Sequence, residues 1–292
     1  MAWYDGVLEA FGNGLIDSGQ WFMEIGIGVW KASANIVTSI ISVSPISYAP
    51  DAWGIVTTVY QSFLGIGASL MSLYFVIGWC RESIDIKNSF TLENMFRFFL
   101  RLSITAGLLT SGLGLIREFL YLSSAVAGDI SGTLTTSYDA GNLFTSVREG
   151  LSGGAEWIAS GLICFLGGII GGFIIVGSGI GIVITIMRRF FKIFLCIPFA
   201  PVALAGFAGG GGLSQTGIAW IKTFFTYCLE VVVIALALVI AFKMFSSGTS
   251  FFASEDGLVG AILRICEICL PMLTAAACVK GAEETVRRCM GL

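Results

Sequence analysis

The sequence has 292 residues, of which 56% are hydrophobic and only 12% are charged. A soluble domain of this length carries roughly twice that fraction of charged residues, so the composition excludes soluble protein classes and requires lipid to cover much of the surface. The net charge of −3 gives no overall basic field of the kind that marks nucleic-acid-binding domains. We therefore expect an all-α integral membrane protein.

Residues 1–51 form the first predicted region, in which short apolar stretches alternate with single charges. Trp21 and Ile25 recur at helical spacing, and Asp17 and Glu24 interrupt the apolar stretches. This pattern is typical of an amphipathic helix, which we place at the extracytoplasmic interface of the membrane. Because the start of the chain lacks the basic segment of a cleavable signal peptide, we expect this region to remain in the mature protein.

Five later stretches are apolar enough to cross a bilayer, which takes about 20 residues in a helix. The second of them is short: it either begins near Phe98 or continues past Arg117 and Glu118, and we expect the first. Residues 117–157, rich in Gly, Ser, Thr and Asp, are predicted to form an outer loop. The polytopic membrane domain is predicted over residues 52–279, with spans at about 54–80, 98–116, 158–187, 223–245 and 257–279.

Residues 193–208 form an apolar segment that contains Pro198 and Pro201 and ends at a run of glycines, 209–212. Sixteen residues with two prolines make a poor crossing. Irregular backbone at membrane depth requires shielding by protein or by a water-lined cavity. We expect a re-entrant or interfacial segment here, in which Pro198, Ala200 and Pro201 are candidates for a pathway or an assembly contact.

Basic residues gather in three segments, 81–101, 188–222 and 280–292, which hold eleven of the sixteen lysines and arginines. The positive-inside rule places these segments in the cytoplasm. It predicts a multi-pass protein of the bacterial cytoplasmic membrane, with its N-terminus outside and a cytoplasmic tail at 280–292. Topology anchors at the level of the lipid headgroups are expected at five positions: Arg188, Arg189, Lys192, Arg287 and Arg288.

Histidine is absent from the sequence, which excludes Ser-His triads, Cys-His pairs and the usual zinc sites. The P-loop pattern for ATP binding is absent as well. Cys266 and Cys269 match C-x-x-C, but a single pair within a predicted span favours packing over redox or metal chemistry. We expect neither an enzyme nor a bound cofactor or metal.

Glu230, Arg264 and Glu267 fall at membrane depth within predicted spans, where each needs a partner or water. Arg264 and Glu267 lie three residues apart and can pair on one helix face. They either fix local packing or line a hydrated pathway or a subunit contact. Glu230 has no evident partner at the same depth, and it is either a headgroup-level residue or a functional one.

Glycines spaced three and four apart in the third predicted span indicate close helix packing, either within one subunit or between copies. Trp220, ahead of the fourth span, is either an ordinary interfacial aromatic residue or part of a pathway or assembly contact. The glycines predicted to pack are Gly167, Gly168, Gly171, Gly172, Gly177 and Gly181.

The order of features from residue 188 to residue 223 resembles the central region of the TrbL-type polytopic subunits of type IV secretion systems. In that family a basic helix end precedes an apolar Ala-Pro segment, a cytoplasmic loop and an amphipathic lead-in that contains a Trp. The likeness covers about residues 157–279, and the compact chain is similar to the forms in Gram-positive mobile elements. The matching residues are Arg188-Arg189-Phe190-Phe191-Lys192, then Ala200-Pro201, then Trp220-Ile221-Lys222-Thr223.

This resemblance implies a non-enzymatic channel or platform subunit of a conjugative DNA-transfer machine. The implied partners are other membrane subunits and ATPases of the secretion system, further copies of the chain, the lipid bilayer and, transiently, relaxase-bound single-stranded DNA. The alternative is a small-solute or ion-coupled transporter that uses Glu230, Arg264 and Glu267. Such transporters often have broken helices in two paired repeats, whereas this sequence has one irregular segment, which favours the platform.

Overall fold

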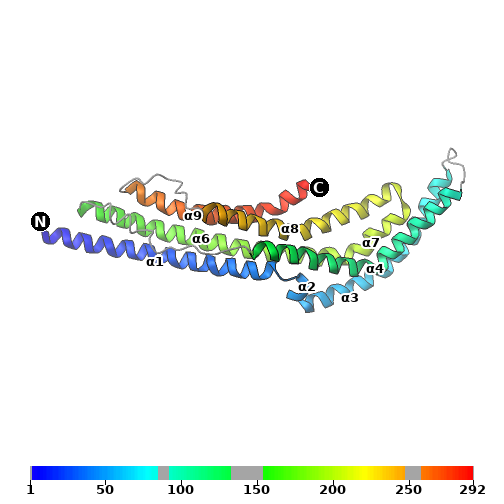
Figure 1. Ribbon diagram of the computed structural model, residues 1–292, viewed down its shortest axis with the longest axis horizontal. Coiled ribbons are helices and arrows are strands. Elements are labelled where there is room, and N and C mark those ends of the chain that lie inside the picture. The colour runs from blue at the N-terminus through cyan, green and yellow to red at the C-terminus, as the bar shows by residue number, and fades with distance from the viewer. Residues whose placement is uncertain (1, 85–91, 133–153, 247–257, 292) are drawn as a thin grey trace. The chain divides into compact units, whose positions relative to one another are not determined.

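The computed structural model describes residues 2–84, 92–132, 154–246 and 258–291 of the chain (Figure 1). All regular elements within these ranges are helical. The α-helices are α1 (Ala2–Ile41), α2 (Pro45–Tyr48), α3 (Pro50–Ile84), α4 (Leu92–Ser131), α6 (Gly154–Cys196), α7 (Ala200–Ala205), α8 (Ser214–Ser246) and α9 (Leu258–Cys289). Short 3₁₀ helices lie between them: η1 (Ile197–Phe199), η2 (Gly206–Gly209) and η3 (Gly211–Leu213).

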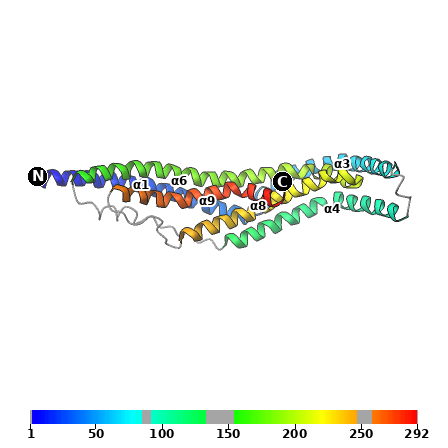
Figure 2. The same ribbon diagram turned by 90° about the horizontal axis from the view of Figure 1, so that it is seen from above.

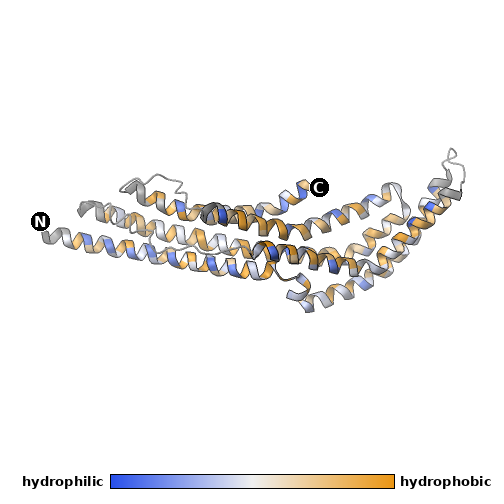
Figure 3. Ribbon diagram, in the orientation of Figure 1, coloured by the Kyte–Doolittle hydropathy of each residue, from blue (hydrophilic) through white to orange (hydrophobic). Residues whose placement is uncertain are grey.

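Five helical segments of the described chain are long and apolar enough to cross a membrane. The predicted class, an all-α membrane protein with five such helices and an additional N-terminal helix, is confirmed. Figure 3 shows hydrophobic residues along the length of these helices. The segments are Pro50–Arg81, Met95–Ser131, Ile158–Gly209, Gly211–Lys243 and Ile265–Cys289.

Several helices extend beyond the predicted ends of the spans. Helix α4 continues past Arg117 and Glu118 to Ser131, so residues 117–131 are helical where an outer loop was predicted to begin at residue 117. Both charged side chains are exposed on the helix surface, and Arg and Glu are good helix formers. The rest of the predicted loop, apart from residues 154–157 in α6, lies largely outside the described residues. Helix α9 likewise continues to Cys289, through most of the predicted tail.

The chain forms two compact units, each assembled from three stretches of sequence. The chain passes from one unit to the other several times along the sequence. The boundaries of the units therefore do not coincide with the domain boundaries predicted at residues 51 and 279. Unit 1 comprises Met1–Ser39, Ile130–Ile186 and Ile234–Gly281, and unit 2 comprises Ile40–Asp129, Met187–Val233 and Ala282–Leu292.

In unit 1, α1 and α6 pack closely through small residues that are spaced seven apart on α1 (Figure 2). A Cβ built on Gly19 or on Gly168 would collide with the backbone of the other helix. The residue numbers rise together on both helices, which shows that the helices run in parallel. The contacts join Gly12 to Gly161, Gly19 to Gly168, Gly26 to Gly172 and Ser33 to Gly179.

The rest of the buried face of α1 follows the same seven-residue spacing. Ile16, Met23, Trp30 and Val37 are between 0 and 3% exposed. Because α1 lies parallel to residues 161–179 of α6, it shares the tilt of that part of α6 relative to the membrane. The N-terminal amphipathic helix is thus present, but it packs lengthwise on a helix that is apolar enough to span, which differs from the predicted position flat on the membrane surface.

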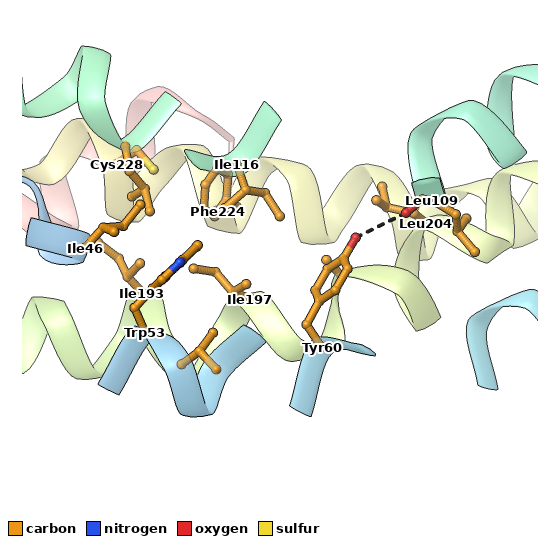
Figure 4. Packing of buried hydrophobic residues seen from close by; sticks show 13 residues of the cluster. Ile46, Trp53, Tyr60, Leu109, Ile116, Ile193, Ile197, Leu204, Phe224 and Cys228 are labelled. Atoms are coloured by element: carbon orange, nitrogen blue, oxygen red, sulfur yellow. Dashed lines mark hydrogen bonds between the residues drawn. The ribbon is translucent and has the colours of Figure 1, made fainter. Parts of the chain in front are cut away.

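The core of unit 2 lies where α3, α4 and α8 surround the end of α6 and the short helix α7 (Figure 4). Trp53 and Ile197 are among its buried residues, together with Phe224. The Tyr60 hydroxyl donates a hydrogen bond of 3.4 Å to the Leu109 carbonyl oxygen and so joins α3 to α4. This core holds in place the proline-containing segment that the sequence analysis singled out.

Candidate functional site

The proline-containing segment forms the first arm of a helical hairpin. From Cys196 the helical path continues through η1, α7 and η2, and the chain reverses at Gly210 and Gly211, whose φ angles are 60° and 51°. Glycine adopts positive φ at little cost. Helix α8 then returns alongside this arm. Residues 193–208 therefore form one arm of the hairpin, and the chain reverses just after them, at the glycine run.

Trp220 closes this hairpin by a hydrogen bond that the prolines make available. Pro201 has no backbone N–H, and the N–H of Ala200 donates to the Ile197 carbonyl oxygen. That 3₁₀ bond takes Ala200 away from the Cys196 carbonyl, its partner in a regular α-helix. The Nε1 of Trp220 donates to this carbonyl oxygen at 3.1 Å. Trp220 thus clamps the hairpin by joining α8 to the end of α6 inside the protein. Its ring also stacks on Phe224.

Ala200 and Pro201 are buried against α3. A Cβ on Gly67 would come within 2.8 Å of the Pro201 backbone, and a Cβ on Gly78 would come within 2.6 Å of the Gly209 carbonyl oxygen. The Ala-Pro pair and the end of η2 therefore approach α3 as closely as backbones allow. In unit 2, Ala200 and Pro201 therefore take part in the packing on α3.

The hairpin's first arm runs parallel to α3. The ring of Tyr48 lies 5.2 Å from that of Phe190, and the ring of Phe63 lies 5.3 Å from that of Phe199. The contact of Gly78 with Gly209 continues the same order. Residue 190 therefore lies at the start of α3, and the glycine turn lies at its end.

This register bears on the predicted orientation. The charge count places residues 81–101 and residues 188–192 on the same side of the membrane. In unit 2, Arg81 and Arg101 lie at one end of α3, and residues 188–192 lie at its other end. Residues 50–81 of α3 are a candidate span. With α3 crossing the bilayer, the two basic segments face opposite sides. The positive-inside count treated them as equivalent because it takes no account of which helices pack together.

Arg189 lies at the base of the hairpin and is only 1% exposed. Its Nε donates a hydrogen bond of 2.9 Å to the Tyr227 carbonyl oxygen on α8. Its Nη2 is buried without a hydrogen-bond partner in the described part of the chain. This environment differs from the lipid-headgroup contact predicted for Arg189, whereas the neighbouring Arg188 is exposed.

Glu230, on α8, is also 1% exposed. Its Oε2 finds no hydrogen-bond partner among the described residues. The carboxyl group interacts electrostatically with Lys192 and Glu283 and with Arg189. The structure therefore supplies the partners that the sequence did not reveal, and they come from α6 and α9.

Lys192 connects this group to the last turns of α9. Its Nζ forms an ion pair with Glu283 and lies 5.6 Å from the centre of the Tyr227 ring. Arg287 approaches the other oxygen of Glu283 at 3.5 Å. Two predicted topology anchors thus share one carboxylate. Arg288 pairs with Glu284 on the exposed side of α9.

We name Arg189, Lys192, Glu230 and Glu283 the charge cluster. Burying unpaired charge costs several kcal/mol, and membrane-depth ionisable groups are costly for the same reason. The cluster leaves one buried donor open, on Arg189, and one buried acceptor, on Glu230. Water offers both complementary functions, so the cluster is suited either to hold three helices in one alignment or to accept water between them.

The other predicted ionisable residues lie elsewhere. Glu267 is half-buried and belongs to unit 1, whereas Glu230 belongs to unit 2. The side chain of Arg264 is outside the described residues. Within the described ranges, His, Cys, Asp and Glu side chains form no group of three or more that could hold a metal ion.

The glycines of the third predicted span divide between two neighbours in unit 1. Gly168 and Gly172 face α1, Gly167 faces Ile265 of α9, and Gly171 lies between Met23 of α1 and Cys269 of α9. A Cβ on Gly181 would lie 3.5 Å from the Lys280 side chain, and one on Gly177 would meet no atom within 4 Å. All of these glycines except Gly177 therefore have a packing neighbour within the same chain.

Two features of this arrangement escaped the sequence analysis. The seven-residue spacing of Gly12, Gly19, Gly26 and Ser33 is visible in the sequence and would have indicated a packing face on the N-terminal helix. Glu283 had no distinguishing sequence signal, because it lies in a polar tail 91 residues from its partner.

In a comparison with known proteins, no protein-family model, curated protein or solved structure matches the chain.

Proposed function

We propose that the chain is a non-enzymatic, multi-pass subunit of a membrane machine that transfers macromolecules, of the type IV secretion kind that carries out conjugative DNA transfer. Three implied partners go with this proposal: other membrane subunits, the secretion ATPases and further copies of the chain. Transient contact with single-stranded DNA belongs to the same proposal. The bacterial cytoplasmic membrane is the proposed location.

The charge cluster is the observation that carries the proposal. The basic helix end, the Ala-Pro segment and the Trp-bearing lead-in are the features that resemble the TrbL-type subunits, and all three meet in unit 2. Arg189 and Lys192 hold α8 and α9, Pro201 packs on α3, and Trp220 clamps the hairpin. A scaffold with these contacts is suited to a platform, because its helices are kept in one alignment while other subunits assemble on it.

The apolar outer face of α6 supports a role within an assembly or a bilayer. Large apolar side chains on this helix are exposed along its length, among them Phe173 at 74% and Phe191 at 68%. Lipid tails or neighbouring subunits cover such surfaces. A soluble enzyme would not retain them.

Deletion of the gene from a donor cell that carries a conjugative element tests the proposal directly. We expect transfer of the element to recipients to be lost and to return when the gene is supplied in trans. Normal transfer without the chain would overturn the proposed function. Membrane abundance of the ATPases is measured in parallel, because loss of their anchoring accompanies loss of the platform.

Glu230→Gln then tests the charge cluster, with Glu284→Gln as the matched control on the exposed side of α9. We expect Glu230→Gln to reduce transfer by about tenfold or more, equivalent to about 1.4 kcal/mol, at unchanged membrane abundance. Glu284→Gln removes a surface pair of small value and should leave transfer unchanged. Equal transfer by both variants would show Glu230 to be a structural residue only.

A small-solute or ion-coupled transporter remains the second candidate, and the open acceptor on Glu230 favours it. Ion-coupled transport places buried carboxylates at its sites. Purified protein in liposomes distinguishes the two functions. Uptake of an ion or solute by the wild type that is lost in Glu230→Gln supports the transporter. Absence of uptake by the wild type supports the platform.

A further inference from the structure

Two arginines and the glycine turn meet at the far end of the hairpin in unit 2. A Cβ built on Gly210 would fall on the guanidinium of Arg101, and the Nη1 of Arg81 lies 3.7 Å from the position of a Cβ on Gly211. Arg81 comes from the end of α3 and Arg101 from the first turns of α4. Both guanidiniums therefore converge on one turn from separate helices.

Among the described residues, no carboxylate compensates the positive charge of this group. Arg81 and Arg101 are exposed, and neither forms an ion pair with a carboxylate of the described chain. The Arg101 guanidinium lies 5.6 Å from the centre of the Phe98 ring, which orients it. An anion is a suitable partner for such a pair of exposed guanidinium groups.

The surroundings place the two arginines at the edge of an apolar layer. Arg81 ends one candidate span, and the glycine turn separates two others. Beside them the rings of Phe75, Trp79 and Phe98 touch one another at 5.7 to 6.3 Å. Aromatic rings with adjacent basic residues are typical of the headgroup region of a bilayer.

We propose that Arg81, Arg101 and the turn at Gly210–Gly211 bind the phosphate group of an anionic phospholipid. Guanidinium groups bind phosphate through paired, charge-assisted hydrogen bonds. Exposed Phe96, Phe99 and Leu100 adjoin the arginines on α4, at 69, 53 and 49% exposure. A lipid satisfies both features, with its headgroup on the arginines and its tails on the apolar face, whereas a nucleic acid would leave that face in water.

Gly210 connects the shape of the turn to the binding site. Its φ of 60° favours glycine, and its missing side chain leaves the space that the Arg101 guanidinium occupies. A methyl group at this position displaces Arg101 from the turn. Gly212 has no atom within 4 Å of its Cβ position, and it provides a matched control two residues away.

The experiment uses the full chain purified in detergent and reconstituted into nanodiscs of phosphatidylcholine doped with phosphatidylglycerol. Lipid retained by the protein is measured by native mass spectrometry. We expect the wild type and Gly212→Ala to retain phosphatidylglycerol over phosphatidylcholine. Arg81→Gln with Arg101→Gln should lose the preference, and Gly210→Ala should weaken it severalfold. Arg288→Gln, an exposed arginine elsewhere, should keep it.

Two further arms separate the sources of phosphate. Inorganic phosphate at millimolar concentration should not displace the lipid, and a short single-stranded oligonucleotide should not compete for it. Displacement by inorganic phosphate would overturn the lipid assignment in favour of a small-anion site, and competition by the oligonucleotide would overturn it in favour of nucleic acid. If the double variant retained phosphatidylglycerol as the wild type does, the two arginines would not form the binding site. DNA transfer does not enter these measurements, so their outcome is independent of the proposed function.

Discussion

Arg189 donates its Nε hydrogen to the carbonyl oxygen of Tyr227, at 2.9 Å, and thereby joins α6 to α8 at the base of the hairpin. Its neighbour in sequence, Arg188, is exposed. Successive residues on an α-helix point about 100° apart, so two adjacent arginines of the same helix end occupy opposite environments. The expected effects of their substitution differ accordingly.

Arg189→Gln should destabilise the protein by about 3–5 kcal/mol, because it removes the bond to Tyr227 and one of the positive neighbours of the buried Glu230. Arg188→Gln should change stability by about 0.5 kcal/mol or less, as is usual for an exposed position. Thermal unfolding of the purified variants in the same detergent measures both. Similar melting temperatures for the two would contradict the buried position of Arg189.

Trp220→Phe should cost about 1–3 kcal/mol, because the Cys196 carbonyl loses its donor. The destabilisation caused by Trp220→Phe should be about 1 kcal/mol smaller in a Pro201→Ala background. There the N–H of residue 201 can bond to the Ile197 carbonyl and release Ala200 for Cys196. A double-mutant cycle on thermal stability measures this coupling. Additive effects would show that Trp220 acts through its ring alone.

Gly168→Ala and Gly177→Ala should change stability in opposite directions. The first places a methyl group on the Gly19 backbone and should destabilise by about 1–3 kcal/mol through overpacking. The second fills open space on an exposed helix surface and should stabilise by about 0.5–1 kcal/mol. Unfolding in detergent tests both signs. A stabilising Gly168→Ala would exclude the close approach of α1 and α6.

Single cysteines introduced at Gly212 and Glu284, in a background without the native cysteines, report on membrane orientation. With α3 crossing the bilayer, we expect a membrane-impermeant maleimide to label Gly212→Cys from the side of Arg81 and Glu284→Cys from the other. The pairing of Glu283 with Lys192 places the end of α9 near the start of α3. Labelling of both from the same side would support the orientation from charge counting.

The sequence predicted the helices well and their lengths poorly. Charge-free intervals such as residues 52–80 are a direct consequence of the bilayer's thickness, and they became helices in the structure. The ends were misplaced because a charged residue does not stop a helix. Helix α4 passes Arg117 and Glu118 without interruption.

The candidate site was predicted in part. Glu230, Trp220 and Pro201 were chosen from the sequence, and the structure places them in one unit. The burial of Arg189 could not be predicted, because Arg188 and Arg189 are chemically identical and only the position of α8 distinguishes them. Pairings such as that of Lys192 with Glu283 join residues far apart in sequence, and local patterns carry no information about such partners.

The parallel contact of α1 with α6 imposes an order on biosynthesis. Two helices that follow one another directly can insert together as a hairpin, but α1 leaves the ribosome before α3 and α4, and its glycine-lined partner surface is made only after them. Until then its small-residue face has no permanent neighbour in the nascent chain. The small-residue face of α1 therefore stays uncovered by the chain until α6 is synthesised. Any insertase or lipid that covers this face in the meantime is displaced when α6 packs against it.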